Sequence, residues 1–90
     1  MFKTLEEMIG IIRKRKESPV KGSYTNELLK NKKLSIEKVK EEITELIDAV
    51  EKNSNKIHEA ADVFYHLIMF LEANEIKIEE VMEELNKRKK

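Results

Sequence analysis

Two pairs of acidic residues, each pair three positions apart, constrain this chain most strongly. The first pair is Glu42 and Glu45, and the second pair is Glu59 and Asp62. On a helix, residues three apart lie on neighbouring turns of one face. The second pair belongs to the segment 57–71, whose side chains are apolar nearly all the way round, as in a helix buried on most sides. Because buried carboxylates need a partner, the pattern predicts a functional site.

A short turn between the two acidic segments predicts that the pairs meet. Asn53, Ser54 and Asn55 separate a helix expected over 36–52 from the helix that carries the second pair, and a turn of this length folds two helices back on each other. Carboxylates about 5 Å apart repel by roughly 3 kcal/mol per pair at an effective dielectric near 20, so four of them require a cation. Oxygen ligands favour Mg²⁺, with Mn²⁺ as the alternative.

Composition limits the size of the core and the classes of partner. Ninety residues with 40% hydrophobic content predict a single domain over 1–90, whose marginal core would gain from association of two copies. Lys plus Arg and Asp plus Glu number 18 each, so no overall charge favours nucleic acid or a membrane as a partner. No segment approaches a membrane span, and a chain without cysteine suits the cytoplasm, where we expect the protein.

The remaining pattern predicts an all-α fold, a bundle of about four main helices. Thr4 opens an expected first helix in a capping box and Glu17 ends it, while Ser35 is the expected cap of the long second helix and Asn55 that of the third. Apolar residues of the second helix form one stripe: Val39, Ile43, Leu46, Ile47 and Val50. A fourth, shorter amphipathic helix is indicated by Ile78, Val81, Met82 and Leu85.

Polar residues around the break at Pro19 allow two interpretations. Ser23 or Thr25 is expected to cap a short helical stretch, and the same hydroxyls would also serve an anion site. Arg15 lies in a basic run that complements the negative end of the first helix, and it could equally meet a phosphate at the loop entrance. Lys38 could be solvated, pair with an acid or contact a phosphate.

His66 follows Asp62 by four residues and also has two interpretations. The first is a hydrogen-bonded core histidine, and the second is a residue that supports a metal ligand or touches the substrate. His58 is expected to be exposed and is assigned no role.

These motifs resemble a known enzyme family. The segments Glu42-Ile43-Thr44-Glu45 and Glu59-Ala60-Ala61-Asp62 are similar to the E-x-x-E and E-x-x-D signature of the MazG-like, all-α nucleoside triphosphate pyrophosphohydrolases. Within that superfamily, the chain resembles phosphoribosyl-ATP pyrophosphohydrolase, the second enzyme of histidine biosynthesis, over almost its whole length. Further segments carry this closer resemblance: Ile11-Ile12, Arg15-Lys16, Pro19, Ser23-Tyr24-Thr25 and Tyr65-His66-Leu67.

The resemblance implies a Mg²⁺-dependent homodimer that binds phosphoribosyl-ATP and cleaves it between the α and β phosphates, giving phosphoribosyl-AMP and pyrophosphate. It implies Glu41 as an additional ligand or as the residue that orients the attacking water. The implied metal ligands are Glu42, Glu45, Glu59 and Asp62. The implied substrate contacts are Arg15, Ser23, Tyr24, Thr25 and Lys38. Lys40 replaces the usual glycine and Ile43 the usual small residue, which puts the exact substrate in question.

Three alternatives compete with this interpretation. A broader MazG-like pyrophosphohydrolase would share the metal site and act on other (deoxy)nucleoside triphosphates. A helical interaction module would explain the amphipathic helices, but it would leave Glu59 and Asp62 without a reason. A di-iron bundle would use Glu-x-x-His pairs, which neither His58 nor His66 provides. If the chain acts as a phosphoribosyl-ATP pyrophosphohydrolase, we expect the next enzyme of the pathway, phosphoribosyl-AMP cyclohydrolase, to be a separate chain that could contact this one.

Overall fold

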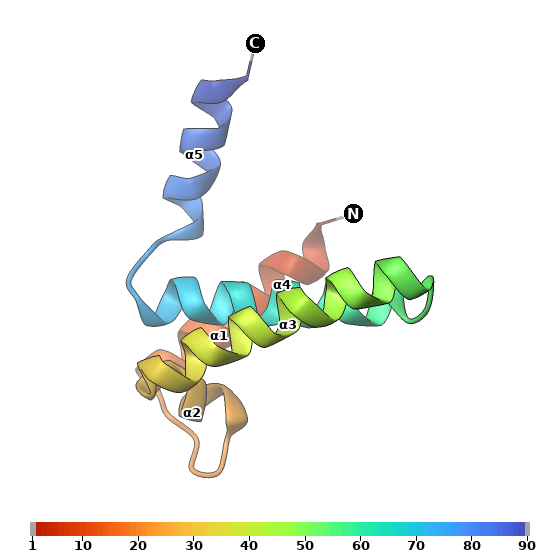
Figure 1. Cartoon of the computed structure of the whole chain (residues 1–90). Coiled ribbons are helices and arrows are strands. Elements are labelled where there is room, and N and C mark those ends of the chain that lie inside the picture. The colour runs from red at the N-terminus through yellow and green to blue at the C-terminus, as the bar shows by residue number, and fades with distance from the viewer. Residues whose placement is uncertain (1, 90) are drawn as a thin grey trace.

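The fourth helix of the chain is the element on which the first three helices pack. The computed structural model describes residues 2–89, which form five α-helices and no strand (Figure 1). The all-α prediction is therefore confirmed, and the expected short stretch after Pro19 is a helix of its own. In chain order the helices are α1 (Lys3–Glu17), α2 (Tyr24–Lys30), α3 (Lys32–Lys52), α4 (Lys56–Ala73) and α5 (Ile78–Arg88).

Helices α3 and α4 form the antiparallel hairpin that the short turn predicted (Figure 1). Asn53 and Asn55 have φ values of 53° and 55°, in the left-handed region. Asparagine enters this region more readily than most residues because its short side chain can hydrogen-bond locally. Two left-handed residues in three positions reverse the chain, so the two acidic segments come to lie side by side.

Three residues that were expected to cap helices with their side chains do not do so in the structure. Thr4 lies inside α1, which begins after Phe2 without a side-chain cap, and Asn55 precedes α4 without a side-chain cap hydrogen bond. Ser35 lies buried inside α3, because Asn31 caps that helix four residues earlier by accepting a hydrogen bond from the Leu34 amide at 3.1 Å. Asn31 also terminates α2, so a single residue joins the two helices.

The hydrophobic core lies where α1, α2 and α4 meet. Its buried members are Ile12 of α1, Leu28 of α2, and Ile68 and Met69 of α4. Deep burial of these side chains supplies the favourable apolar term of folding. The core fixes α2 against α4, and it thereby places the start of α2 near the acidic segment.

Three of the five residues of the apolar stripe of α3 point away from the core, whereas Val39 and Leu46 are half-buried. Ile43, Ile47 and Val50 are exposed, whereas Glu42 and Ala49, on the opposite face, are buried. Helix α4 is likewise open on one side, with Phe64 57% exposed, so the expectation that this helix is buried on most sides is wrong for a single chain. Only the inward faces of α3 and α4 have partners within the described residues.

Helix α5 projects away from the other helices and is held at its first turn (Figure 1). Arg13 of α1 bridges Glu72, at the end of α4, and Glu79 of α5, with nitrogen–oxygen distances of 3.2 and 2.6 Å. This hydrogen-bonded ion pair lowers the pKa of Glu79 to about 2. No helix in residues 2–89 is both long and apolar enough to cross a membrane.

We expect Glu79→Gln to lower the thermal midpoint at neutral pH, because it removes one of the two carboxylates bound by Arg13. A carboxylate whose folded-state pKa is depressed stabilises the fold above its unfolded pKa, and this stability is lost as pH falls toward the folded value of about 2. Circular dichroism melts should therefore show the difference between wild type and variant shrinking from pH 5 to pH 2.

The matched control is Glu80→Gln, which removes an acid from the same first turn of α5 without an ion pair in the described structure. An equal effect of both substitutions at all pH values would show that the helix terminus, and not the Arg13 bridge, carries the stabilisation.

Candidate metal and substrate site

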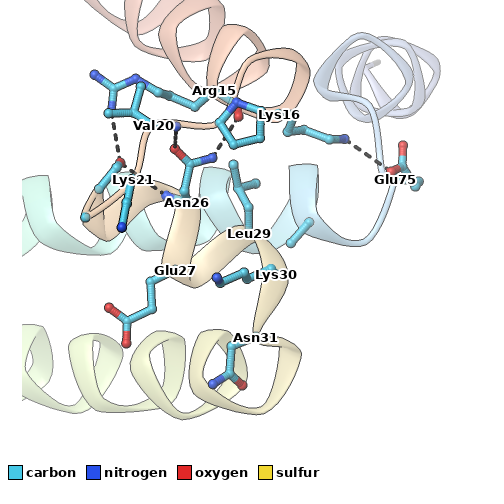
Figure 2. A pocket seen from close by; sticks show the side chains of 14 residues that line it. Arg15, Lys16, Val20, Lys21, Asn26, Glu27, Leu29, Lys30, Asn31 and Glu75 are labelled. Carbon is cyan, nitrogen blue, oxygen red and sulfur yellow. Dashed lines mark hydrogen bonds and ion pairs between the residues drawn. The ribbon is translucent and has the colours of Figure 1, made fainter.

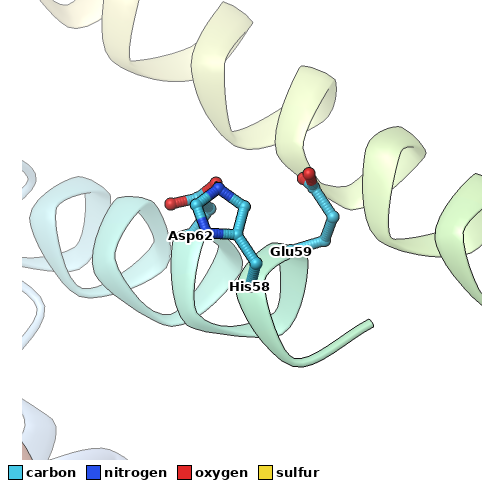
Figure 3. A group of neighbouring side chains, drawn as sticks. All are labelled: His58, Glu59 and Asp62. Carbon is cyan, nitrogen blue, oxygen red and sulfur yellow. The ribbon is translucent and has the colours of Figure 1, made fainter. Parts of the chain in front are cut away.

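Four carboxylates from the hairpin form two overlapping groups. Glu42 and Glu45 of α3 join Glu59 of α4 in the first group, in which one oxygen of each lies within 4.8 Å of the others. Glu59 also belongs to the second group, with Asp62 and a nitrogen of His58 (Figure 3). The structure thus brings together all four acids predicted as metal ligands, with Glu59 shared between the groups.

Two oxygens of the first group are buried without a hydrogen-bond partner. They are Oε2 of Glu42 and Oε2 of Glu59. Burial is the main cause that raises the pKa of both carboxyls, and the neighbouring charge of Glu45 raises it further. A buried carboxylate that lacks a partner is costly, and a bound cation would remove that cost. The all-oxygen donors of Glu42, Glu45 and Glu59 fit a hard divalent ion.

His58 is a neighbour of the site that the sequence interpretation left without a role. Its Nε2 lies 3.4 Å from a carboxylate oxygen of Asp62, on the exposed side of α4 (Figure 3). The sequence could have predicted this contact, because His58 and Asp62 are four residues apart and therefore lie on one helix face. As expected, His58 is exposed.

Glu41 lies outside both groups. Its carboxylate accepts a hydrogen bond from the Lys38 ammonium at 3.3 Å, on the outer surface of α3. This hydrogen bond is the main cause that raises the pKa of Lys38, which keeps the lysine charged. Glu41 and Lys38 therefore form an exposed ion pair beside the buried acids.

His66 is a hydrogen-bonded core histidine that connects α4 to α2. Its Nδ1 is 3.0 Å from the carbonyl oxygen of Asp62, and its Nε2 is 3.2 Å from the hydroxyl of Tyr24. A carbonyl only accepts, so Nδ1 carries the proton, and in the neutral ring Nε2 then accepts from the Tyr24 hydroxyl. Burial raises the pKa of Tyr24, which keeps this donor protonated. His66 thus ties Tyr24 to the backbone of the acidic segment.

The residues around the start of α2 are fixed by hydrogen bonds. Ser23 caps α2, as one of the two sequence interpretations predicted, by accepting from the Asn26 amide at 3.3 Å. Nη1 of Arg15 donates to the same serine oxygen at 2.9 Å. The hydroxyls of Thr25 and Tyr65 lie 2.7 Å apart. Arg15 and Ser23 are therefore joined to each other, while Tyr24 and Thr25 are each hydrogen-bonded to a residue of α4.

Fold and site together define a class of protein, an all-α protein whose helical hairpin presents carboxylates suited to a divalent cation and a phosphate chain. The family model described as phosphoribosyl-ATP pyrophosphohydrolase matches residues 5–89. The chain belongs to this family of hydrolases, which act on phosphoric anhydrides. The resemblance inferred from the acidic segments and the Ser-Tyr-Thr element is confirmed.

Curated relatives agree with the family match. A phosphoribosyl-ATP pyrophosphatase of Clostridium novyi is 43% identical, over 96% of this chain and 81% of the relative. One of Methanocella arvoryzae is 38% identical over the full length of both proteins. The histidine biosynthesis bifunctional protein HisIE of Pyrococcus furiosus is 46% identical over 96% of this chain, which spans 41% of that longer protein.

We expect Glu42→Gln to stabilise the metal-free protein. The substitution removes a buried charge, and the new amide can donate to the neighbouring carboxylates of Glu45 and Glu59. A gain of about 1 kcal/mol, which corresponds to roughly 4–8 °C in a domain of this size, is the expected scale. Thermal melts in chelator measure it.

Glu37→Gln is the matched control, because Glu37 is an exposed acid of the same helix outside both groups. A loss of stability in the Glu42 variant, with the control unchanged, would contradict the picture of repelling, unpartnered carboxylates.

Proposed function

We propose that this chain hydrolyses phosphoribosyl-ATP between the α and β phosphates, in a Mg²⁺-dependent reaction that gives phosphoribosyl-AMP and pyrophosphate. The observation that carries the proposal is the pair of buried, unpartnered carboxylate oxygens of Glu42 and Glu59 in a chain of this family. Water supplies the attacking oxygen, so one new P–O bond forms while the bridging P–O bond breaks. No covalent intermediate on the protein is required.

The four acids of the hairpin are the proposed metal ligands: Glu42, Glu45, Glu59 and Asp62. Mg²⁺ is the proposed ion, with Mn²⁺ as the alternative. When bound, such an ion would offset the negative charge that develops on the phosphate chain during cleavage. The protein's part is to hold these carboxylates on two rigid helices, with His66 fixing the Asp62 backbone.

Glu41 and Lys38 are proposed to act at the edge of the metal site. Glu41 orients the attacking water or serves as an additional ligand, and its exposed carboxylate is accessible for either role. Lys38 already balances the charge of Glu41 at 3.3 Å, and the nearby Tyr24 and Glu42 also help to raise the pKa of Lys38. A charged lysine in this place can contact a phosphate of the substrate.

The remaining proposed substrate contacts lie along the start of α2. They are Arg15, Ser23, Tyr24 and Thr25. The hydrogen bonds from Arg15 to Ser23 and between Tyr24 and His66 hold these side chains in place before substrate arrives. Preorganisation of this kind lowers the entropic cost of binding.

We also propose that the protein works as a homodimer, in which a second copy covers the outward faces of α3 and α4. These faces expose Ile43, Ile47 and Val50 of α3, and Ile57 and Phe64 of α4. Several large apolar side chains exposed on neighbouring helices favour an interaction site. Because the faces belong to the hairpin that holds the acids, covering them would also rigidify the site.

A separate phosphoribosyl-AMP cyclohydrolase is a further proposed partner, because it would use the product of this reaction. The bifunctional Pyrococcus furiosus relative supports the idea, since most of that protein lies outside the part that this chain matches.

Action on other (deoxy)nucleoside triphosphates is the second candidate, suggested by Lys40 and Ile43. Both side chains are exposed on α3, on the side away from the buried Glu42. Neither offers a group to the carboxylate site, so these two departures from the family pattern do not favour a different substrate. A panel of nucleoside triphosphates assayed beside phosphoribosyl-ATP separates the two candidates.

We predict metal-dependent pyrophosphate release from phosphoribosyl-ATP by the purified protein. Glu42→Gln and Asp62→Asn should each lower kcat/KM by about 100-fold or more, since they remove direct ligands and even outer-shell changes cost 10–100-fold. A coupled pyrophosphate assay with Mg²⁺ or chelator measures this. Circular dichroism of each variant confirms that it is folded. Full activity of both variants would contradict the metal assignment.

We predict that Ile47→Glu converts a dimer into a monomer, because it places a charge in the proposed apolar interface. Light scattering after size-exclusion chromatography measures the mass. Ile11→Glu is the matched control, because Ile11 is an equally exposed isoleucine on α1, outside the hairpin. A wild-type monomer, or a dimer that tolerates Ile47→Glu, would overturn the proposed interface.

A further inference from the structure

A cavity lies between the end of α1, the loop that follows it and α2. It has a volume of about 920 Å³, which is within the usual range for small-molecule sites. Its walls come from the end of α1, the loop that follows it, α2, the last residue of α4 and Glu75 beyond it (Figure 2). None of the four carboxylates of the metal site lines this cavity, which we call the α2 pocket.

The α2 pocket has an excess of positive charge, although the whole chain has a net charge of zero. Four cations line it, Arg15, Lys16, Lys21 and Lys30, against two acids, Glu27 and Glu75. Lys16 bonds Glu75 at 3.3 Å and points away from Arg15 in Figure 2. Arg15, Lys21 and Lys30 have no ion-pair partner within residues 2–89. A local excess of unpaired cations attracts an anion.

Arg15 is the most firmly placed of these cations. Its Nη1 donates to the Ser23 hydroxyl at 2.9 Å, and its backbone carbonyl accepts from the Asn26 side chain at 2.7 Å. Asn26 also accepts from the Val20 amide at 2.7 Å, so the loop and α2 are held together (Figure 2). The pocket is therefore a formed structure before a ligand enters.

The first turn of α2 connects the pocket to the carboxylate site. Ser23 lines the pocket, and the next residue, Tyr24, contacts His66 at 3.2 Å. His66 in turn holds the backbone of Asp62 at 3.0 Å. The pocket and the carboxylates therefore lie at the two ends of one chain of contacts, and a ligand that reaches both must be extended and carry an anionic group at each end.

Phosphoribosyl-ATP, the substrate assigned under the proposed function, is such a ligand. It carries a triphosphate on one ribose and a separate 5′-monophosphate on the ribose attached to the base. We propose that the α2 pocket binds this 5′-monophosphate, with Arg15, Lys21 and Lys30 as its cationic contacts, while the triphosphate lies at the carboxylates. Ordinary nucleoside triphosphates lack the second phosphate, so this pocket would select phosphoribosyl-ATP over them.

The test is the kinetics of Lys21→Gln, Lys30→Gln and the double variant. The substrates are phosphoribosyl-ATP and its analogue without the 5′-phosphate. Each substitution should raise KM for phosphoribosyl-ATP on the order of fivefold, the upper range for an exposed ion pair, with a smaller effect on kcat. The rise should be absent with the dephosphorylated analogue. Lys14→Gln and Lys33→Gln, exposed lysines outside the pocket, are the matched controls and should leave KM unchanged.

Two failures can be told apart. If wild type hydrolyses phosphoribosyl-ATP but the double variant keeps the wild-type KM, or loses equally with both substrates, the pocket assignment is wrong and the proposed function stands. If wild type does not hydrolyse phosphoribosyl-ATP at all, the proposed function fails and the pocket assignment fails with it.

Discussion

The burial of an acidic side chain, Glu42, where α3 packs against α4 is the constraint on which the rest of the structure depends. Most helical hairpins bury an apolar stripe, but here Glu42 is buried and the apolar Ile43 and Ile47 point outward. Burial without hydrogen-bond partners raises the pKa of Glu42 and Glu59 and makes the metal-free site unfavourable. The buried carboxylates lower the stability of the metal-free fold, and a bound cation would restore it. Such a local loss of stability is characteristic of a functional site.

The same arrangement connects the site to the proposed assembly. With Glu42 facing inward, the exposed apolar residues of the hairpin need cover from outside the chain, and a second copy would provide it. The core, meanwhile, is formed by α1, α2 and α4, and it sets α2 beside the acids. The first turn of α2 has a contact on each side: Tyr24 hydrogen-bonds to His66 near the carboxylates, and Ser23 lines the cationic α2 pocket. One short helix could therefore position both ends of an extended substrate.

The sequence was sufficient to predict the helices, the hairpin and the proximity of the four acids, because these depend on short-range spacing. It did not predict which face of α3 points inward, since an apolar stripe shows a helix face and not the neighbour that covers it. Asn31 was missed as a cap because Ser35 offered an equally good local signal. The contact between Tyr24 and His66 joins residues 42 positions apart, so only the folded chain reveals it.

A crystal structure of the protein grown with Mn²⁺, with data collected at the manganese absorption edge, would test the central claim most directly. The account predicts an anomalous peak coordinated by oxygens of Glu42, Glu45 and Glu59. A hairpin with ordered carboxylates and no peak among them at saturating Mn²⁺, or a peak bound only elsewhere, would contradict it.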